Sequence, residues 1–292
     1  MAINAVRVGS HEVAEGGKFL IIAGPCVIES YEMLLKTATH LHELSTKHNF
    51  NLVFKSSFDK ANRTSVNGFR GPGLEKGLEM LADIKAKLGM PVLSDIHEAE
   101  QCPLAGTVLD VLQIPAFLCR QTDLLVAAAR TGKCVNVKKG QFLAPRDMKN
   151  AVKKIVDSGN KNILLTERGT SFGYNNLVVD FRAIPIMKEN GYPVIFDATH
   201  SVQIPGGAGD ASTGERQYVP TLARAAVVAG VNGMFMETHP NPDEAKSDGP
   251  NQVPLAQAEE LISQVLQLYN VVKDMPDISL PAPGQCKQFA TI

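Results

Sequence analysis

The sequence predicts an α/β fold, a single (β/α)8 TIM barrel with a short N-terminal hairpin. Eight short apolar runs alternate with eight helical patterns along the chain. The runs are continuous rather than interrupted by polar residues, which is typical of parallel strands that are buried on both faces. Eight such units in about 250 residues match the usual size of a closed barrel.

An open doubly wound sheet is the alternative fold. Such a sheet usually carries a glycine-rich nucleotide-binding turn after its first strand. Here that turn, residues 24–30, reads GPCVIES, and the chain has no GxGxxG motif. Because no linker rich in Gly, Ser or Pro divides the sequence internally, we predict one large domain rather than two.

The chain opens with a predicted hairpin over residues 5–14 that turns at Gly9-Ser10. The first strand, 19–24, leads to helix 31–48, where leucines recur at helical spacing and Ser30 is placed to cap the start. The remaining strand and helix pairs follow in order: 52–56 with 74–88, 91–95 with 98–105, 110–114 with 121–131, 133–137 with 147–158, 162–167 with 176–190, 193–197 with 215–229, and 233–237 with 254–273. Residues 1–275 form the predicted barrel domain, and the Pro-rich tail, 276–292, is expected to lie extended or disordered outside it.

Composition excludes several classes of protein. The formal net charge of -1 over 292 residues argues against bulk nucleic-acid binding, which needs an excess of Lys and Arg. The 5 cysteines are widely spaced and form no CxxC pair, so we expect a reducing compartment rather than a disulfide framework. No apolar run has the length of a signal peptide or a membrane span, and we therefore expect a soluble cytoplasmic protein with no membrane partner.

A basic loop follows the second predicted barrel strand. Lys55, Lys60, Arg63 and Arg70 fall within residues 52–73, where only Asp59 opposes them. Neutral donors and glycines in the same loop allow backbone amides to approach a ligand closely. The loop indicates an anionic ligand, phosphate above all, although an exposed basic loop that keeps the protein in solution would read the same way by itself.

The carboxyl ends of the barrel strands carry most of the remaining polar candidates. In this fold those ends and the loops after them face one common site. The candidates, in chain order, are Cys26, Lys55, Lys60, Arg63, Asp95, His97, Gln113, Pro115, Arg120, Lys138, Lys139, Glu167, Arg168, Asp197, His200, Glu237, His239 and Asp248. Solvation alone would not favour one end of the barrel, so this asymmetry predicts a functional site there.

Two subsets of these residues differ in their chemistry. Six cations from four loops could hold a carboxylate and two phosphates if they converge: Lys55, Lys60, Arg63, Arg120, Lys138 and Arg168. A thiol, an imidazole and two carboxylates could hold Fe(II), Zn(II) or Mn(II): Cys26, His200, Glu237 and Asp248. A buried Cys is more often a small apolar packing residue, so Cys26 alone would be weak support for a metal site.

Several segments resemble the 3-deoxy-D-manno-octulosonate 8-phosphate synthases. They are FKSSFDKANRTS (54–65), FRGPG (69–73), GPCVIES (24–30), QIPAFLCRQTDLL (113–125), NVKKGQF (136–142), ERGTSFGYNNLVVD (167–180), FDATHS (196–201), FMETHPNP (235–242) and SDGP (247–250). The resemblance covers roughly residues 18–273. It implies a homotetrameric (β/α)8 barrel that condenses phosphoenolpyruvate with arabinose 5-phosphate and releases phosphate, on the route to lipopolysaccharide.

The resemblance also implies roles for individual residues. Phosphoenolpyruvate would be held by Lys55, Lys60, Lys138 and Arg168, with Gln113 and Ala116 lining its pocket. Arabinose 5-phosphate would be positioned by Asn62, Arg63, Thr64 and Ser65, with Asp95 facing the sugar and Arg120 reaching into a neighbouring subunit's site. Catalytic roles are implied for Lys60, Asn62, Asp95 and His200.

Position 26 divides this family. Members with Asn there work without a metal, whereas members with Cys, as in this chain, resemble the class that needs a divalent ion. Its other ligands match His200, Glu237 and Asp248, and no organic cofactor is implied. Two alternatives stay open: a 3-deoxy-D-arabino-heptulosonate 7-phosphate synthase, whose sugar loop typically reads KPRTS where this chain has KANRTS, and a non-catalytic phosphosugar-binding barrel.

Overall fold

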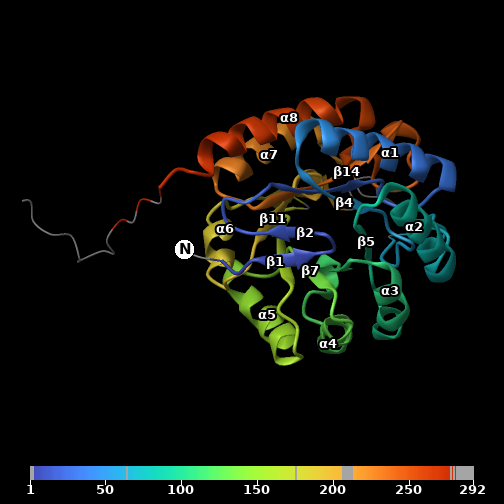
Figure 1. Cartoon of the computed structure of the whole chain (residues 1–292), viewed down its shortest axis with the longest axis horizontal. Helices are drawn as coiled ribbons and strands as arrows, with labels where there is room; N and C mark the ends of the chain where they lie inside the picture. The colour runs from blue at the N-terminus through green and yellow to red at the C-terminus, as the bar shows by residue number, and fades with distance from the viewer. Residues whose placement is uncertain are drawn as a thin grey trace, which may run out of the picture.

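Eight parallel strands form a closed barrel in the computed structural model of this chain (Figure 1), as predicted. The structure describes residues 3–63, 65–174, 176–205 and 213–276, together with 278 and 280. The barrel strands are β3 (Leu20–Gly24), β4 (Asn51–Lys55), β5 (Val92–Asp95), β6 (Val111–Ile114), β7 (Cys134–Lys138), β8 (Ile163–Glu167), β11 (Val194–Asp197) and β14 (Gly233–His239). Each pairs with its neighbour in this order, and β14 pairs with β3 to close the ring.

The barrel strands are buried along their whole length, which explains their continuous apolar sequence. At the end of β3 the backbones approach so closely that only glycine fits. A Cβ atom on Gly24 would lie 1.9 Å from the carbonyl oxygen of Lys55, and the φ of Gly24 is 154°. This approach fixes the point at which the chain leaves β3 and enters the segment that carries Cys26.

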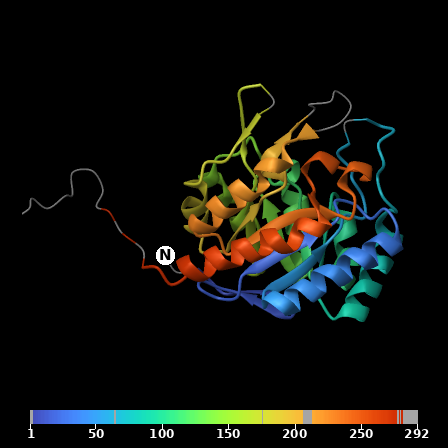
Figure 2. The ribbon, with the colours of Figure 1, turned by 90° about the horizontal axis from the view of Figure 1, so that it is seen from above.

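The α-helices surround the strands (Figures 1 and 2). They are α1 (Tyr31–His48), α2 (Leu74–Leu88), α3 (Cys102–Val108), α4 (Thr122–Arg130), α5 (Met148–Asp157), α6 (Ala183–Lys188), α7 (Val219–Val228) and α8 (Leu255–Val272). In α1 the Ser30 hydroxyl accepts a hydrogen bond from Met33 N at 3.2 Å, the predicted cap, and Leu34, Ala38 and Leu41 form its buried stripe. In the part of the chain that the structure describes, no helix combines the length and the apolarity that a membrane crossing needs.

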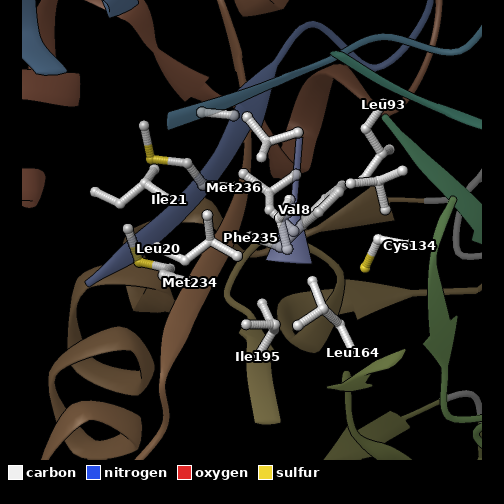
Figure 3. Close-up of a cluster of buried hydrophobic side chains, with 14 of the residues drawn as sticks. Val8, Leu20, Ile21, Leu93, Cys134, Leu164, Ile195, Met234, Phe235 and Met236 are labelled. Atoms are coloured by element: carbon white, nitrogen blue, oxygen red, sulfur yellow. The ribbon is translucent and has the colours of Figure 1, made fainter. Parts of the chain in front are cut away.

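The predicted N-terminal hairpin closes the amino end of the barrel. Its strands are β1 (Val6–Val8) and β2 (His11–Val13), and Figure 1 shows them lying across the strands. His11 Nε2 lies 2.9 Å from Leu52 O, and Arg7 N donates to Asn162 Oδ1 at 3.2 Å. Val8 is fully buried and lies among the core side chains of Figure 3. The opposite, carboxyl end is the one left for a ligand.

One predicted helix is largely wrong. Residues 176–190 were expected to be helical, but β10 (Asn176–Val178) pairs there with β9 (Thr170–Phe172), and α6 spans only Ala183–Lys188. The run Leu177-Val178-Val179 favours a strand because β-branched side chains pack well in sheets. Gly173, with φ 62°, supplies the turn of this hairpin, which Figure 2 shows projecting from the barrel.

Smaller elements decorate the same end of the barrel. β12 (Gln203–Ile204) pairs with β13 (Thr213–Gly214), and β15 (Val253–Pro254) extends the sheet beside β14. A short 3-10 helix, Arg216–Tyr218, precedes α7, so the α-helix starts later than the predicted residue 215. The prediction for the tail concerns residues 276–292, most of which lie outside the described residues.

Candidate active site

A cavity of about 190 Å³ opens at the carboxyl end of the barrel. We call it the mouth cavity. It is lined by Lys60, Asn62, Asp95, His97, Pro115, Ala116, Phe117, Lys138, Gln141, Arg168, His200, Gln203, Pro205, Glu237 and Asp248. A larger cavity of about 360 Å³ lies between α7 and α8, but none of the predicted site residues lines it. The predicted site residues that line a cavity are therefore found in the smaller one.

Three predicted metal ligands meet beside the mouth cavity. The Cys26 sulfur and one carboxylate oxygen each of Glu237 and Asp248 lie within 4.8 Å of one another. Cys26 Sγ is 3.2 Å from Asp248 Oδ2, and Glu237 Oε2 is buried with no hydrogen-bond partner among the described residues. A buried carboxylate oxygen without a partner is costly unless a cation offsets its charge, so this donor set fits a borderline-soft divalent ion.

The fourth predicted ligand, His200, borders this cluster without belonging to it. Its Nε2 lies 3.7 Å from Glu237 Oε2. Its Nδ1 lies 2.8 Å from Asp197 Oδ2, at an angle too poor for a good hydrogen bond. This contact leaves Nε2 directed at the cluster, which is the arrangement in which a carboxylate orients a metal-binding imidazole.

The closed barrel explains why these ligands converge. Cys26 follows β3, Glu237 lies in β14, and the two strands pair through Gly24 and Glu237. Asp248 begins a 3-10 helix (Gly249–Asn251) in the left-handed conformation, with φ 49°, and its Oδ1 accepts a hydrogen bond from Gln203 Nε2 at 3.1 Å. The strained backbone and this hydrogen bond aim the Asp248 carboxylate at Cys26.

Burial and neighbouring charges set the protonation states of the cluster. Burial, and then the negative charge of Glu237, raise the pKa of the Cys26 thiol. Burial alone would also raise the pKa of Asp248, but Lys60 and His200 outweigh it and the pKa is lowered. Without a bound cation the cluster therefore holds a protonated thiol and ionised carboxylates, and a divalent ion would have to displace the thiol proton.

Three predicted substrate cations line the mouth cavity. Lys138 Nζ donates to Asp197 Oδ2 at 2.7 Å and lies 3.8 Å from the centre of the Phe235 ring. Arg168 Nη2 donates to Gln203 Oε1 at 2.9 Å, while its Nη1 is buried without a partner among the described residues. Burial would lower the pKa of Lys60, but the neighbouring Cys26, Glu237 and Asp95 side chains outweigh burial and raise it. An anion in this cavity would find fixed positive charge and an unused donor.

Lys55 lies behind the mouth cavity rather than in its wall. Its side chain is 1% exposed. Its Nζ donates to Glu237 Oε1 at 2.6 Å and to the carbonyl oxygen of Cys26 at 2.8 Å. These bonds use only Oε1 of Glu237, so Lys55 helps to shape the cluster of Cys26, Glu237 and Asp248 in addition to the substrate role that the resemblance implies.

Gln113 does not line the cavity either, because it belongs to a chain of buried hydrogen bonds that crosses the barrel. Its Nε2 donates to Asp95 Oδ1 at 2.7 Å, and its Oε1 accepts from Asn136 Nδ2 at 2.9 Å. Asn136 Oδ1 in turn accepts from the Thr166 hydroxyl at 2.7 Å, and Ser57 donates to Asp95 Oδ2 at 2.5 Å. The chain holds the Asp95 carboxylate in the cavity wall with both oxygens paired.

Only some of the predicted sugar-binding residues line the mouth cavity. Asn62 and Ala116 line the mouth cavity. Arg63 does not line it, because its Nη1 donates to Ser247 Oγ at 2.9 Å and its Nη2 to the carbonyl oxygen of Lys246 at 2.5 Å. Ser65 also lies outside the wall, and Thr64 lies outside the described residues. Arg120 is exposed and away from this cavity, with its carbonyl oxygen bonded to Lys154.

Sequence reasoning missed several residues of the wall. Phe117, Gln141, Gln203 and Pro205 line the cavity, but none of them is charged and none was predicted as a site residue, although Phe117 and Gln141 lie in family-like segments. Asn136 and Thr166 were missed for a related reason, since they are small neutral residues inside apolar strands. The period-two alternation along a strand, counted from Lys138 and Arg168, could have placed both on the inner face.

Known proteins resemble this chain over most of its length. The family model described as the DAHP synthetase I family matches residues 6–274. A protein of Trichlorobacter lovleyi named 2-dehydro-3-deoxyphosphooctonate aldolase is 59% identical over 268 residues, 92% of this chain and 98% of the relative. Proteins with the same name are 59% identical over 256 residues in Cyanothece sp. (88% and 94%) and 57% identical over 272 residues in Brucella canis (93% and 98%).

Proposed function

The chain belongs to the DAHP synthetase I family, and from that premise we propose that it joins phosphoenolpyruvate to D-arabinose 5-phosphate and water, giving 3-deoxy-D-manno-octulosonate 8-phosphate and inorganic phosphate. The relatives named above carry a name for an enzyme of this product. One observation of the site carries the chemistry. Lys60, Lys138 and Arg168 place three cations in a single cavity next to the cluster of Cys26 and Glu237.

The reaction proceeds in three steps. C3 of the enol ester attacks the aldehyde carbon of the open-chain sugar; the new C–C bond forms as the C2–C3 and aldehyde π bonds break, the aldehyde oxygen takes up a proton, and C2 becomes electron-poor. Water adds to C2 and gives up a proton. In the resulting hemiketal phosphate the new hydroxyl loses its proton and forms the ketone at C2, while the bond between C2 and the phosphate oxygen breaks and phosphate leaves.

The cavity residues suit these steps. Lys138 and Arg168 would bind the anionic groups of phosphoenolpyruvate and hold its C3 toward the sugar, which lowers the entropic cost of the attack. Asp95 stays ionised, because Lys55, Lys60 and Lys138 outweigh the effect of burial and lower its pKa. It can therefore accept a hydrogen bond from a sugar hydroxyl.

Cys26, Glu237 and Asp248, with His200 turned toward them, would hold a divalent ion, Fe(II), Zn(II) or Mn(II). Such an ion supplies a Lewis acid that polarises the aldehyde oxygen or a water molecule. Asp197 keeps the His200 ring in place. We propose no organic cofactor.

Assembly and location are part of the same proposal. We propose that residues 1–275 form the catalytic domain of a homotetramer in which Arg120 reaches a neighbouring site, and the exposure of Arg120 supports this. We also propose a cytoplasmic location and a role in lipopolysaccharide synthesis. The free thiols of Cys26, Cys102, Cys119 and Cys134 support a reducing compartment.

Sugar choice tests the function. With phosphoenolpyruvate in excess and a divalent metal supplied, arabinose 5-phosphate should release phosphate far faster than erythrose 4-phosphate, because Asn62-Arg63 occupies the loop where the four-carbon enzymes typically carry Pro-Arg. Phosphate release and direct competition between the two sugars measure this. Equal or reversed rates would indicate a 3-deoxy-D-arabino-heptulosonate 7-phosphate synthase. If neither sugar led to phosphate release, a non-catalytic phosphosugar-binding protein would be favoured.

Two single variants test whether the substrates have separate sub-sites. Arg63→Ala should weaken arabinose 5-phosphate binding and Lys138→Ala phosphoenolpyruvate binding, each by about ten- to a hundredfold, the usual worth of a charged hydrogen bond. Calorimetric titration of each ligand gives the dissociation constants. Arg146→Ala removes an exposed arginine and should change neither. The same loss for both ligands in both variants would contradict separate sub-sites.

A further inference from the structure

Two buried ionisable residues have no part in the reaction described above. Lys139 is 0% exposed and Glu167 is 1% exposed, and neither lines the mouth cavity. Each adjoins a substrate cation in the sequence, because Lys139 follows Lys138 and Glu167 precedes Arg168. Lys139 directly follows β7, and Glu167 is the last residue of β8. The alternation of side chains along these strands, continued one residue past each end, agrees with Lys138 and Arg168 lining the cavity while Lys139 and Glu167 do not.

Lys139 ties together the two loops that leave β7 and β8. Its Nζ lies 3.2 Å from the carbonyl oxygen of Gly169, in the loop after β8, and 3.0 Å from Oγ1 of Thr170, the first residue of β9. On its own loop it lies 3.3 Å from Gly140 O and 3.4 Å from Leu143 O. One ammonium group thus joins backbone from two loops at the back of the site.

Glu167 shapes the turn that carries Arg168. Its Oε1 accepts hydrogen bonds from Arg168 N at 3.1 Å and from Gly169 N at 2.7 Å, and it lies 3.6 Å from Lys139 Nζ. Gly169 has φ 89°, a conformation that other residues rarely adopt. The carboxylate therefore holds the backbone amides of both Arg168 and the residue after it.

Stability alone does not explain why these charges are buried. Burial lowers the pKa of Lys139 and raises that of Glu167, so burial opposes the charged form of both groups. Replacing a buried ion pair by apolar residues of similar volume is often neutral or stabilising. What the pair supplies beyond apolar packing is directional bonding to the loops of Lys138 and Arg168.

We propose that Lys139 and Glu167 are positioning residues that hold Lys138 and Arg168 in register around phosphoenolpyruvate. This inference rests on the proposed function, which names the anion. It sharpens that function by separating the cations that touch the substrate from a hidden pair that acts through them. Because Arg63 is held by a different loop, the arabinose 5-phosphate sub-site should not depend on this pair.

The test compares Lys139→Met, Glu167→Gln and the double variant with the wild type. Calorimetric titration should show phosphoenolpyruvate binding weakened by about tenfold in each single variant, the scale of one charged hydrogen bond, with arabinose 5-phosphate binding within about twofold of the wild type. The double variant should be about as weak as the weaker single variant, because residues that act as one unit are not additive. The KM for phosphoenolpyruvate should rise in parallel while the KM for the sugar stays constant.

Lys153→Met is the matched control, since it removes an exposed lysine paired with Asp157 and should leave both affinities unchanged. If Lys139→Met does not fold, Thr170→Val removes one contact of the Lys139 ammonium and should give a smaller loss for phosphoenolpyruvate alone. Unchanged phosphoenolpyruvate binding in the folded variants, or an equal loss for both substrates, overturns the inference. Wild-type turnover is measured first, and its failure would refute the proposed function instead.

Discussion

Treatment with a strong chelator is expected to lower turnover by a factor on the order of a thousand, since a metal Lewis acid supplies several kcal/mol of transition-state stabilisation. The reason lies in the cluster of Cys26, Glu237 and Asp248, whose ligand atoms lie within 4.8 Å of one another and in which Glu237 Oε2 has no hydrogen-bond partner among the described residues. Phosphate release before and after addition of Mn(II), Fe(II) or Zn(II) measures the loss and its recovery. Elemental analysis of the same samples gives the bound metal.

Single substitutions distinguish the loss of the Cys26 thiol as a metal ligand from a general effect on the fold. Cys26→Ala should lose bound metal and activity together, whereas Cys102→Ala, which also deletes a buried sulfur, should keep both. Cys26→Asn installs the residue of the metal-independent class and should retain some metal-free turnover. Because binding displaces the Cys26 proton, metal affinity should rise with pH. Full activity in wild-type protein shown to be free of metal would rule out an essential metal site.

Lys55→Met should lower the free energy of unfolding by about 3 to 5 kcal/mol, the usual cost of removing one partner of a buried ion pair. Among the described residues, this change leaves both Glu237 oxygens buried without a hydrogen-bond donor. Burial raises the pKa of Glu237, but Lys55 and His200 outweigh it and the pKa lies below 4.5. The wild-type stabilisation is therefore present above about pH 4.5 and is lost as the pH falls through the lowered pKa.

Lys47→Met is the matched control for this effect. Lys47 and Glu259 are also 2.6 Å apart, but their side chains are 64% and 37% exposed, so the loss should be under about 1 kcal/mol. Urea unfolding followed by circular dichroism measures both variants, since the chain has 0 tryptophans for fluorescence. Equal losses in the two variants would show that burial does not govern the Lys55 pair.

The barrel could be predicted from sequence because its determinants are local. Runs such as LIIAG at Leu20–Gly24 indicate strands buried on both faces, and Ser30 marks a helix start through one hydrogen bond. The error over residues 176–190 came from Leu177 and its valine neighbours, which fit either a short buried helix or a strand. These residues form a strand because they pair with Ser171 and Thr170. Such pairing depends on the folded structure and cannot be seen in the local sequence.

The site was only partly predictable for a similar reason. Fold geometry brings Cys26, Glu237 and Asp248 together, as strand order alone implies. Charge could not reveal which groups face the substrate. Lys55 and Gln113 were expected in the cavity wall, but Lys55 is committed to Glu237, and Gln113 to Asp95 and Asn136, behind that wall. Their partners depend on the closed barrel and have no signature in the sequence.

The pairing of β14 with β3 determines when the cluster of Cys26, Glu237 and Asp248 can form. Leu20 meets Gly233 in this pair, so β3 keeps one open edge while nearly all of the chain between them is being synthesised. Cys26 emerges early, but Glu237 and Asp248 emerge only with the last strand. A nascent chain therefore cannot assemble the cluster, and the site comes into existence at the moment the ring closes.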